Sequence, residues 1–271
     1  MEAAVLQHAE TSAQLAALAA SLRAAALTAR PIAPVREVLP ERTLSCAYEL
    51  QKLNTRHSIA QGRRLSGRKI GLTSRAVQKQ LGVDTPDFGM LFADMEIPHG
   101  GRIEANRLIA PKVEAEMAFM IGRPIERPDV TLDEVLESVA WVWPALEICD
   151  SRIESWNISI LDTVADNASA GLYGLGAGAK RPADVDFRLA GMRLERNGEA
   201  ESFGAAAACL GSPLNALRWL ARVMAASDWP LLAGDVVLSG ALGPMVAAHP
   251  GDHFKARIDG LGEVAVQFGG K

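Results

Sequence analysis

The sequence lacks the features expected of nucleic-acid-binding and membrane proteins. Among 271 residues, 28 are basic and 32 acidic, so the formal charge is −4. No basic run exceeds three residues, whereas a nucleic-acid surface normally carries a clustered basic patch. No run of 18 or more uncharged apolar residues occurs, so no transmembrane helix is indicated. The N-terminus lacks the basic segment of a signal peptide, and we expect a cytoplasmic protein.

Cysteine is scarce. Cys46, Cys149 and Cys209 are far apart, odd in number and outside any CxxC spacing. Disulfide frameworks and zinc sites normally need even numbers or close pairs of cysteines. We therefore expect three reduced core residues without a disulfide or metal role, as is usual in a reducing compartment.

Common cofactor motifs are absent as well. The run Gly171-Leu-Tyr-Gly-Leu-Gly176 and the loop Gly240-Ala-Leu-Gly243 could contact a ligand, but neither matches a dinucleotide fingerprint or a P-loop. We expect no Ser-His-Asp site, and the histidines show no metal-binding spacing. The histidines are His8, His57, His99, His249 and His253.

Two helices are predicted at the start of the chain. The alanine-rich opening predicts a helix over residues 1–30 that ends before Pro31, and Thr43 is a good cap for a second helix reaching about Gly62. At 49% hydrophobic and 22% charged residues the composition is that of a globular protein. We divide the chain into an N-terminal helical section, residues 1–66, and a catalytic domain, residues 67–271.

Short strands and turns dominate the predicted catalytic domain. Pro144 suggests that the apolar segment 141–148 is an edge or bulged strand. Three further helices are predicted. They begin at Ser74, at the capping box of Thr131 and Glu134 (about ten residues long), and at Ser212-Pro213. Because no βαβ rhythm appears, we expect an α+β fold around a rolled or barrel-like β-sheet.

Glu114 and Glu116 are the most informative residues. They lie in a segment that alternates with period two, which predicts a strand with both carboxylates on one face. The same face continues as Ala118 and Met120, so it is expected to be half-buried. Neighbouring buried anions resist ionisation unless a cation lies between them. A divalent metal with oxygen ligands satisfies this requirement.

Three other residues are candidates for the same site. Glu147 has apolar neighbours; it could pair with Arg152, but with Glu114 and Glu116 it completes a ligand set that selects Mg²⁺, Mn²⁺ or Ca²⁺. Lys69 could balance the excess negative charge, and alternation allows only one of Arg68 and Lys69 to face inward. Asp87 lies in a predicted loop, where a turn or cap role is the ordinary alternative.

Several motifs together resemble the 2-oxopent-4-enoate (2-hydroxypenta-2,4-dienoate) hydratases of the fumarylacetoacetate hydrolase superfamily. The similarity runs from about residue 45 to the end of the chain, in the same order. The motifs are Gly67-Arg-Lys-Ile-Gly-Leu-Thr-Ser74, Pro86-Asp-Phe-Gly-Met-Leu-Phe-Ala-Asp-Met95, Glu114-Ala-Glu116, Pro144-Ala-Leu-Glu-Ile-Cys-Asp-Ser-Arg152, Val164-Ala-Asp-Asn-Ala-Ser169 and Ser239-Gly-Ala-Leu-Gly-Pro-Met245.

The resemblance implies roles for individual residues. Glu114, Glu116 and Glu147 match the metal ligands, with Mg²⁺ or Mn²⁺ as the ion. Lys69 and Asp87 match the acid–base residues. Leu72, Ser169 and Ser239 match substrate contacts.

The resemblance also implies a reaction. The enzyme would add water to 2-hydroxypenta-2,4-dienoate and give 4-hydroxy-2-oxopentanoate, within the meta-cleavage degradation of aromatic compounds. A homo-oligomer, often a pentamer or decamer, is implied, and association with a downstream aldolase or a decarboxylase is possible.

Three alternatives stay open at this stage. A sister branch decarboxylates 4-oxalocrotonate with the same glutamates and lysine, but it tends to replace the aspartate of the Pro-Asp-Phe-Gly motif, so Asp87 favours hydration. An acylpyruvate hydrolase would need a Glu-His pair that is not evident. A non-catalytic partner subunit of a decarboxylase complex could have lost Lys69 or a glutamate, and this chain keeps all of them.

Overall fold

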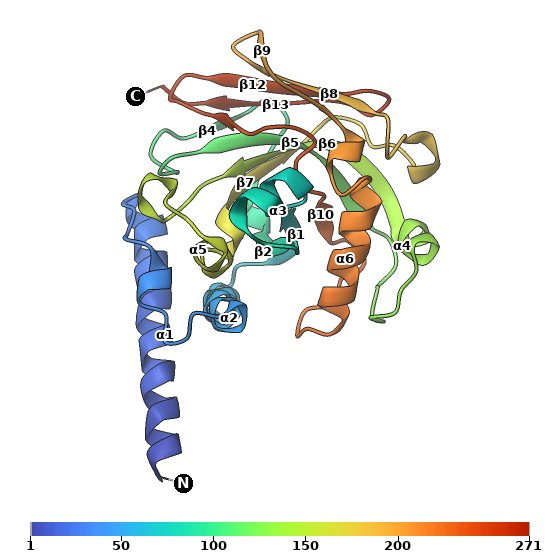
Figure 1. The fold of residues 1–271 in the computed structure, drawn as a ribbon. Helices are drawn as coiled ribbons and strands as arrows, with labels where there is room; N and C mark the ends of the chain where they lie inside the picture. Colours follow the sequence, from blue (N-terminus) through green and yellow to red (C-terminus); the bar gives the residue numbers. More distant parts are fainter. Residues whose placement is uncertain (1, 271) are drawn as a thin grey trace.

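The computed structural model describes residues 2–270, and their first section is helical. Helix α1 (Glu2–Thr28) and helix α2 (Leu44–Ala60) are joined by a segment with a short 3₁₀ turn, η1 (Val35–Glu37). The Thr43 side chain accepts a hydrogen bond from the Cys46 N–H and caps α2, as predicted. In Figure 1 the N-terminal half of α1 projects beyond the other elements.

Two β-sheets follow the helical section. The larger is mixed and has the order β2-β1-β10-β5-β6-β7-β3, with β11 paired to β5. Its strands are β1 (Leu65–Gly71), β2 (Asp87–Phe92), β3 (Glu96–Ile97), β5 (Lys112–Ile121), β6 (Val139–Cys149), β7 (Ala170–Leu175), β10 (Val236–Leu238) and β11 (Val246–Ala247). Two of its pairings, β1 with β10 and β3 with β7, are parallel.

The smaller sheet has the order β4-β13-β12-β8-β9. Its strands are β4 (Gly101–Ile103), β8 (Gly191–Arg196), β9 (Glu199–Ala205), β12 (His253–Ile258) and β13 (Gly262–Phe268). The hairpin between β12 and β13 turns at Asp259 and Gly260. Figure 1 shows this sheet stacked over β5 and β6, and most residues of these two strands are buried. The fold is therefore α+β around a curled mixed sheet.

Short helices cover the other side of the larger sheet (Figure 1). They are α3 (Arg75–Leu81), α4 (Leu132–Ser138), α5 (Ile160–Ala165) and α6 (Pro213–Ala225). Ser212 caps α6, and Thr131 and Glu134 form the predicted capping box of α4. Helix α4 spans 7 residues, shorter than predicted, because the chain turns directly into β6 at Val139. The remaining 3₁₀ turns are η2 (Ala93–Met95), η3 (Glu154–Trp156), η4 (Asn167–Ser169), η5 (Pro182–Asp184) and η6 (Ala206–Ala208).

Two apolar cores hold these elements together. The main core lies between the sheets and under α6, while a smaller one joins α1, α2 and α5 through residues such as Leu22, Leu50 and Val164. The helical section thus packs directly on a helix of the predicted catalytic domain. The boundary between residues 66 and 67 stays a prediction.

The edge-strand prediction for Pro144 is wrong. Strand β6 lies inside the sheet, between β5 and β7. The Pro144 carbonyl accepts from the Gly176 N–H just beyond the end of β7. Because a residue's N–H and C=O point to the same side of a strand, the missing proline N–H also faces the end of β7, where regular pairing has stopped.

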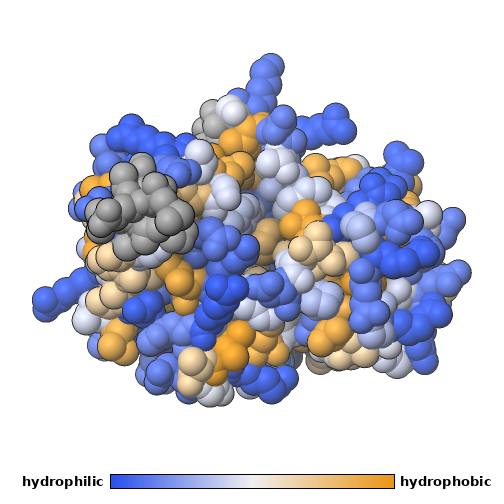
Figure 2. All heavy atoms as spheres, turned by 90° about the horizontal axis from the view of Figure 1, so that it is seen from below, coloured by the Kyte–Doolittle hydropathy of each residue, from blue (hydrophilic) through white to orange (hydrophobic). Residues whose placement is uncertain are grey.

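The face of the molecule seen from below mixes hydrophilic and hydrophobic residues (Figure 2). In Figure 2 the hydrophobic residues form separate patches between the hydrophilic ones, as is ordinary for a protein surface. Within residues 2–270, no helix is both long enough and apolar enough to cross a lipid bilayer.

Candidate active site

Three carboxylates project from one face of two adjacent strands. Glu114 on β5 is the direct cross-strand partner of Glu147 on β6, and Glu116 follows Glu114 on the same face. Directly opposed side chains in an antiparallel pair have Cβ atoms about 5 Å apart, and diagonal neighbours remain within reach. Strand alternation and pairing register therefore bring the three acids together.

Lys69 and Asp87 reach this site from the neighbouring strands β1 and β2. The Lys69 Nζ lies 3.1 Å from the Glu147 Oε1 and donates a hydrogen bond of 2.9 Å to the Ala168 carbonyl. Gly71 is the cross-strand partner of Asp87. A Cβ atom at Gly71 would lie 2.2 Å from the Asp87 Oδ1 and 3.3 Å from the Lys69 Nζ. Only glycine leaves room for this pair of charged groups.

The left-handed turn η4 fixes the position of Lys69. Asn167, Ala168 and Ser169 have φ values of 56°, 52° and 54°, a conformation that non-glycine residues seldom adopt. The Asn167 side chain stabilises the turn, because it both accepts from the Met90 N–H and donates to the Met90 carbonyl. The turn thereby presents the Ala168 carbonyl to the lysine.

The site is deeply buried. The exposed fractions are 0% for Glu116, 1% for Glu147, 2% for Asp87 and 4% for Lys69, whereas Glu114 is partly exposed. Glu114 thus marks the side of the site nearest to solvent. If all were ionised, four carboxylates would face one ammonium group.

Burial and mutual repulsion shift the pKa values of the acids upward. Desolvation, followed by the charge of Glu147, raises the pKa of Glu114 to about 7 and that of Glu116 well above its ordinary value. Desolvation also raises the pKa of Asp87, against the effect of Lys69. For Lys69, desolvation acts to lower the pKa, but the surrounding acids, Glu147 first, raise it well above its ordinary value. The ammonium group is therefore firmly charged.

The donor set fits a hard divalent cation. Among the described residues, three buried carboxylate oxygens accept no hydrogen bond: both oxygens of Glu147 and the Oε1 of Glu116. The Oε2 of Glu116 accepts from the Gly240 N–H at 2.7 Å. Buried carboxylate oxygens without partners are costly in a folded protein. A cation bound by Glu114, Glu116 and Glu147 would satisfy these oxygens.

The predicted substrate contacts lie on three loops. Leu72 follows β1 with a φ of 55°, and its carbonyl accepts from the Gln78 side chain. The Ser169 hydroxyl lies 3.2 Å from the Thr163 hydroxyl. The Ser239 hydroxyl donates to the Gly240 carbonyl and accepts from the Met117 N–H. Thr163 also acts to lower the pKa of Asp87, so it links Ser169 to the acid site.

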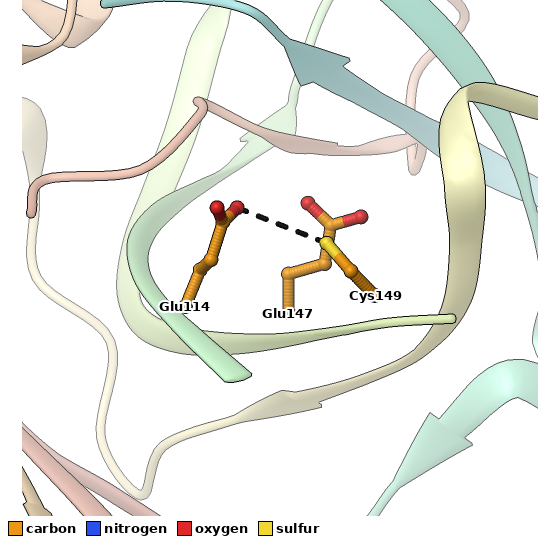
Figure 3. A group of neighbouring side chains, drawn as sticks. All are labelled: Glu114, Glu147 and Cys149. Atoms are coloured by element: carbon orange, nitrogen blue, oxygen red, sulfur yellow. Dashed lines mark hydrogen bonds between the residues drawn. The ribbon is translucent and has the colours of Figure 1, made fainter. Parts of the chain in front are cut away.

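Cys149 was not predicted as part of the site. It follows Glu147 by two residues on the same face of β6, and its thiol donates to the Glu114 Oε2 at 3.8 Å (Figure 3). Strand alternation around Glu147 could have revealed this position. Cys46, Cys149 and Cys209 are buried and free, as expected.

One local prediction around the site is wrong, because Asp87 begins strand β2 instead of lying in a loop. Arg68 and Lys69 point to opposite faces, as alternation predicted, but both are buried, because the sheet is covered on both faces; Arg68 donates to the Trp229 carbonyl. The alternative pairing of Glu147 with Arg152 does not form, since Arg152 pairs with Asp166.

A cleft of about 630 Å³ borders the turn η4 from the side of α1 and α2. Its lining includes Asp166 and Asn167 but none of the three glutamates, Lys69 or Asp87. The cleft is therefore separate from the acid site.

Comparisons with known proteins agree with this architecture. The sequence profile described as fumarylacetoacetate (FAA) hydrolase C-terminal matches residues 52–268. The chain belongs to the fumarylacetoacetate hydrolase family. This membership confirms the fold class and the family resemblance drawn from the motifs.

Two curated relatives to which the chain is similar are hydratases. The chain is 53% identical over 252 residues to 2-keto-4-pentenoate hydratase 2 of Dechloromonas aromatica, covering 93% of this chain and 96% of that protein. It is 42% identical to 2-hydroxyhexa-2,4-dienoate hydratase of Comamonas testosteroni, covering 89% and 92% of the two chains.

A similar solved structure belongs to the same family. It is 4-oxalocrotonate decarboxylase from Pseudomonas putida G7, complexed with magnesium and adipate, with a TM-score of 0.91 and 35% identity. The alignment covers 95% of this chain and 98% of that one. The same enzyme has also been solved with calcium and acetate.

Proposed function

We propose that the protein is a metal-dependent hydratase. It adds water to 2-hydroxypenta-2,4-dienoate, or a close homologue, and yields 4-hydroxy-2-oxopentanoate. The observation that supports this function most directly is the buried group of Glu114, Glu116 and Glu147 beside Lys69 and Asp87. Hydratases of this substrate class, 53% identical over nearly the whole chain, support it.

The proposed cofactor is Mg²⁺ or Mn²⁺, held by Glu114, Glu116 and Glu147. When bound, such an ion supplies Lewis-acid polarisation of the substrate's carboxylate and C2 oxygen. The unpartnered oxygens of Glu116 and Glu147 support this assignment. The magnesium and calcium complexes of the decarboxylase, a family member, add further support.

Lys69 and Asp87 have different roles in the reaction. The reaction first moves the proton of the 2-hydroxyl group to C5, giving 2-oxopent-3-enoate; water then adds at C4, and a proton is delivered to C3. Asp87 has a raised pKa and is suited to carry the proton. Lys69 stays charged and is suited to hold the anionic substrate and stabilise negative charge. A lysine that acts as a general base needs a lowered pKa, whereas the surrounding acids raise the pKa of Lys69.

The turn η4 and its neighbours position these groups. The Ala168 carbonyl fixes the Lys69 ammonium, and Thr163 acts to lower the pKa of Asp87. Burial excludes water from the acids except on the side of Glu114. Leu72, Ser169 and Ser239 stand as the proposed substrate contacts.

The experiment follows the diene absorbance of 2-hydroxypenta-2,4-dienoate with Mg²⁺ or Mn²⁺ added to the metal-free protein. Glu114→Gln should lose about 10³-fold in rate, because Lewis-acid stabilisation is worth several kcal/mol. Glu199→Gln, on the exposed β9 strand, is the matched control and should behave as wild type. Equal rates in wild type and Glu114→Gln would refute the metal assignment.

Decarboxylation of 4-oxalocrotonate is the second candidate, because a decarboxylase shares the fold with a TM-score of 0.91. Its 35% identity is lower than the 53% of the hydratase. Supplying both substrates in parallel and identifying the products separates the two activities. Release of CO₂ from 4-oxalocrotonate without hydration of the dienoate would reverse the assignment.

We also propose that the chain forms a homo-oligomer, a pentamer or a decamer. The projecting N-terminal half of α1 supports a further contact surface (Figure 1). Leu27, which is 88% exposed near the C-terminal end of the same helix, supports it as well. Sedimentation velocity of the full chain measures the subunit number. A monomer at micromolar concentration would contradict this proposal.

A further inference from the structure

Cys149 adds a sulfur atom to the carboxylate site. Its Sγ, one oxygen of Glu114 and one oxygen of Glu147 all lie within 4.8 Å of one another. The three side chains converge from β5 and β6 on the same space (Figure 3). Glu147 is 1% exposed, and among the described residues neither of its oxygens accepts a hydrogen bond. The cysteine therefore lies beside a buried carboxylate whose Oε1 faces the Lys69 ammonium at 3.1 Å and whose Oε2 is free to bind.

We infer that the site has a second binding mode, in which a thiophilic divalent ion such as Zn²⁺, Cd²⁺ or Co²⁺ is bound by the Cys149 sulfur together with Glu114 and Glu147. Mg²⁺ and Mn²⁺ use only the oxygens. The inference shares two carboxylates with the proposed metal centre, and to that extent it rests on the proposed function.

The spacing suits such an ion. Zinc binds thiolate sulfur at about 2.3 Å and carboxylate oxygen at about 2.0–2.2 Å, so donors around one tetrahedral ion lie roughly 3.5 Å apart. The observed 3.8 Å between the Cys149 Sγ and the Glu114 Oε2 is close to this value. Small side-chain rotations bring the three donors onto one ion.

Donor chemistry separates the two groups of ions. Thiolate is a soft ligand that favours zinc and related ions, whereas magnesium and manganese prefer carboxylate and water. On binding a soft ion, the thiol loses its proton to the buffer, and the sulfur lone pair that remains forms the metal–sulfur bond. The hydrogen bond to Glu114 is replaced by a shared ion. The outcome is a site that retains thiophilic ions more tightly than the ions proposed for activity.

The test titrates the metal-free full-length protein with Co²⁺ and records the thiolate-to-metal charge-transfer absorption. Wild type should develop one equivalent of this band, and Cys149→Ser should develop none. Cys209→Ser is the matched control, because Cys209 is equally buried but its thiol donates to the Ser239 carbonyl; it should keep the band. Absence of the band in wild type, or its survival in Cys149→Ser, would overturn the inference.

Competition provides a second measurement. Loss of outer-shell partners alone costs metal affinity roughly 10- to 100-fold, so removal of a direct ligand should weaken Zn²⁺ binding by at least that factor. Mn²⁺ binding, followed by electron paramagnetic resonance, should change less than about threefold in Cys149→Ser, since sulfur is not its ligand. Cys149→Ala repeats the test if the serine variant folds poorly by circular dichroism. Equal losses for the two ions would contradict the inference.

The two proposals fail in distinguishable ways. If Mn²⁺ binds wild type but Co²⁺ gives no thiolate band, only the sulfur assignment is wrong. If Mn²⁺ does not bind wild type at all, the proposed metal centre is wrong, while a thiolate band with Co²⁺ would still support the sulfur-containing mode.

Discussion

Two groups of buried charge differ in how their charges are satisfied. In the paired cluster of Asp150, Arg152 and Asp166, Arg152 and Asp166 form an ion pair, and Asp166 also accepts from the Arg152 N–H at 2.9 Å. Asp150 accepts from the N–H groups of Ile109 and Ala110. Every acid of this cluster is matched by donors, so its charges stabilise a fixed arrangement of loops.

The acid site has the opposite character. It consists of Glu114, Glu116, Glu147 and Asp87 around the single cation Lys69, and several of its oxygens lack donors. Local excess of one charge is a sign that the fold is organised for something it binds. In this protein, the charged groups whose charges are fully paired have a structural role, whereas those with unpaired charge form the candidate active site.

The two groups are connected through the chain. Arg152 also donates to the carbonyls of Asp166 and Ala170, on either side of the turn η4. That turn carries the Ala168 carbonyl which holds Lys69. The paired cluster therefore acts as the anchor of the acid site.

Removal of the single cation should have the largest effect. Lys69→Met is expected to lose roughly 10²- to 10³-fold in the hydration rate, because it removes the charge that stabilises negative charge on the substrate. Mn²⁺ affinity should be equal or higher, since no cation competes for Glu147. The diene assay and paramagnetic resonance measure the two quantities.

Lys52→Met is the control for this substitution. Lys52 pairs with Glu49 on the surface of α2, and its removal should leave both quantities unchanged. Loss of Mn²⁺ binding in Lys69→Met would show that the lysine supports the structure of the site instead of its chemistry.

Breaking the paired cluster should instead affect stability. Asp166→Asn leaves Arg152 buried without its anion, which typically costs about 3–5 kcal/mol of unfolding free energy. Burial raises the pKa of Asp166 to about 6, so urea unfolding at pH 8 compares the ionised pair with the variant. Asp228→Asn, which breaks an exposed pair with Arg56, should cost less than about 1 kcal/mol. Similar losses in both variants would remove the distinction between the buried pair and a surface pair.

The acid site was predictable where it depends on local periodicity. Alternation alone placed Glu114 and Glu116 on one face, and the need for charge compensation added Glu147 and Lys69. The capped helices were equally local, because Thr43 and Thr131 bond to backbone groups only a few residues away. Such features depend on neighbours in the sequence.

Contacts that depend on register between distant strands were not predictable. The burial of both Arg68 and Lys69 follows from covering the sheet on its two faces, which no single segment encodes. Alternation gives the face of β6 on which Cys149 lies, but its contact with Glu114 depends on the pairing of β5 with β6. The left-handed turn at Ala168 has no glycine to signal it and depends on the Asn167 contacts with β2.

Protons should compete with the metal at the acid site. The pKa of Glu114 is raised to about 7 in the metal-free protein. Above that pH the carboxylate is charged and ready to bind; below it, each ion must displace at least one proton. The Kd for Mn²⁺ should therefore rise by at least about tenfold per pH unit below pH 7. A Kd independent of pH from about 5.5 to 8 would contradict the shift.

The smallest expected effect is on stability at the acid site itself. The folded-state pKa of Glu116 lies well above its ordinary value, so the folded protein holds this proton more tightly than the unfolded chain. The resulting stability is present at low pH and is lost as pH rises toward the folded-state pKa. At pH 8 with EDTA, Glu116→Gln removes this penalty, and its amide oxygen can still accept from the Gly240 N–H. The free energy of unfolding should stay equal or rise by about 1 kcal/mol, in contrast to Asp166→Asn.

With saturating Mn²⁺, wild type should instead be more stable than Glu116→Gln, because only wild type gains binding energy in the folded state. A large loss in EDTA would mean that Glu116 is a structural acid like Asp166, and the contrast between the two groups would disappear.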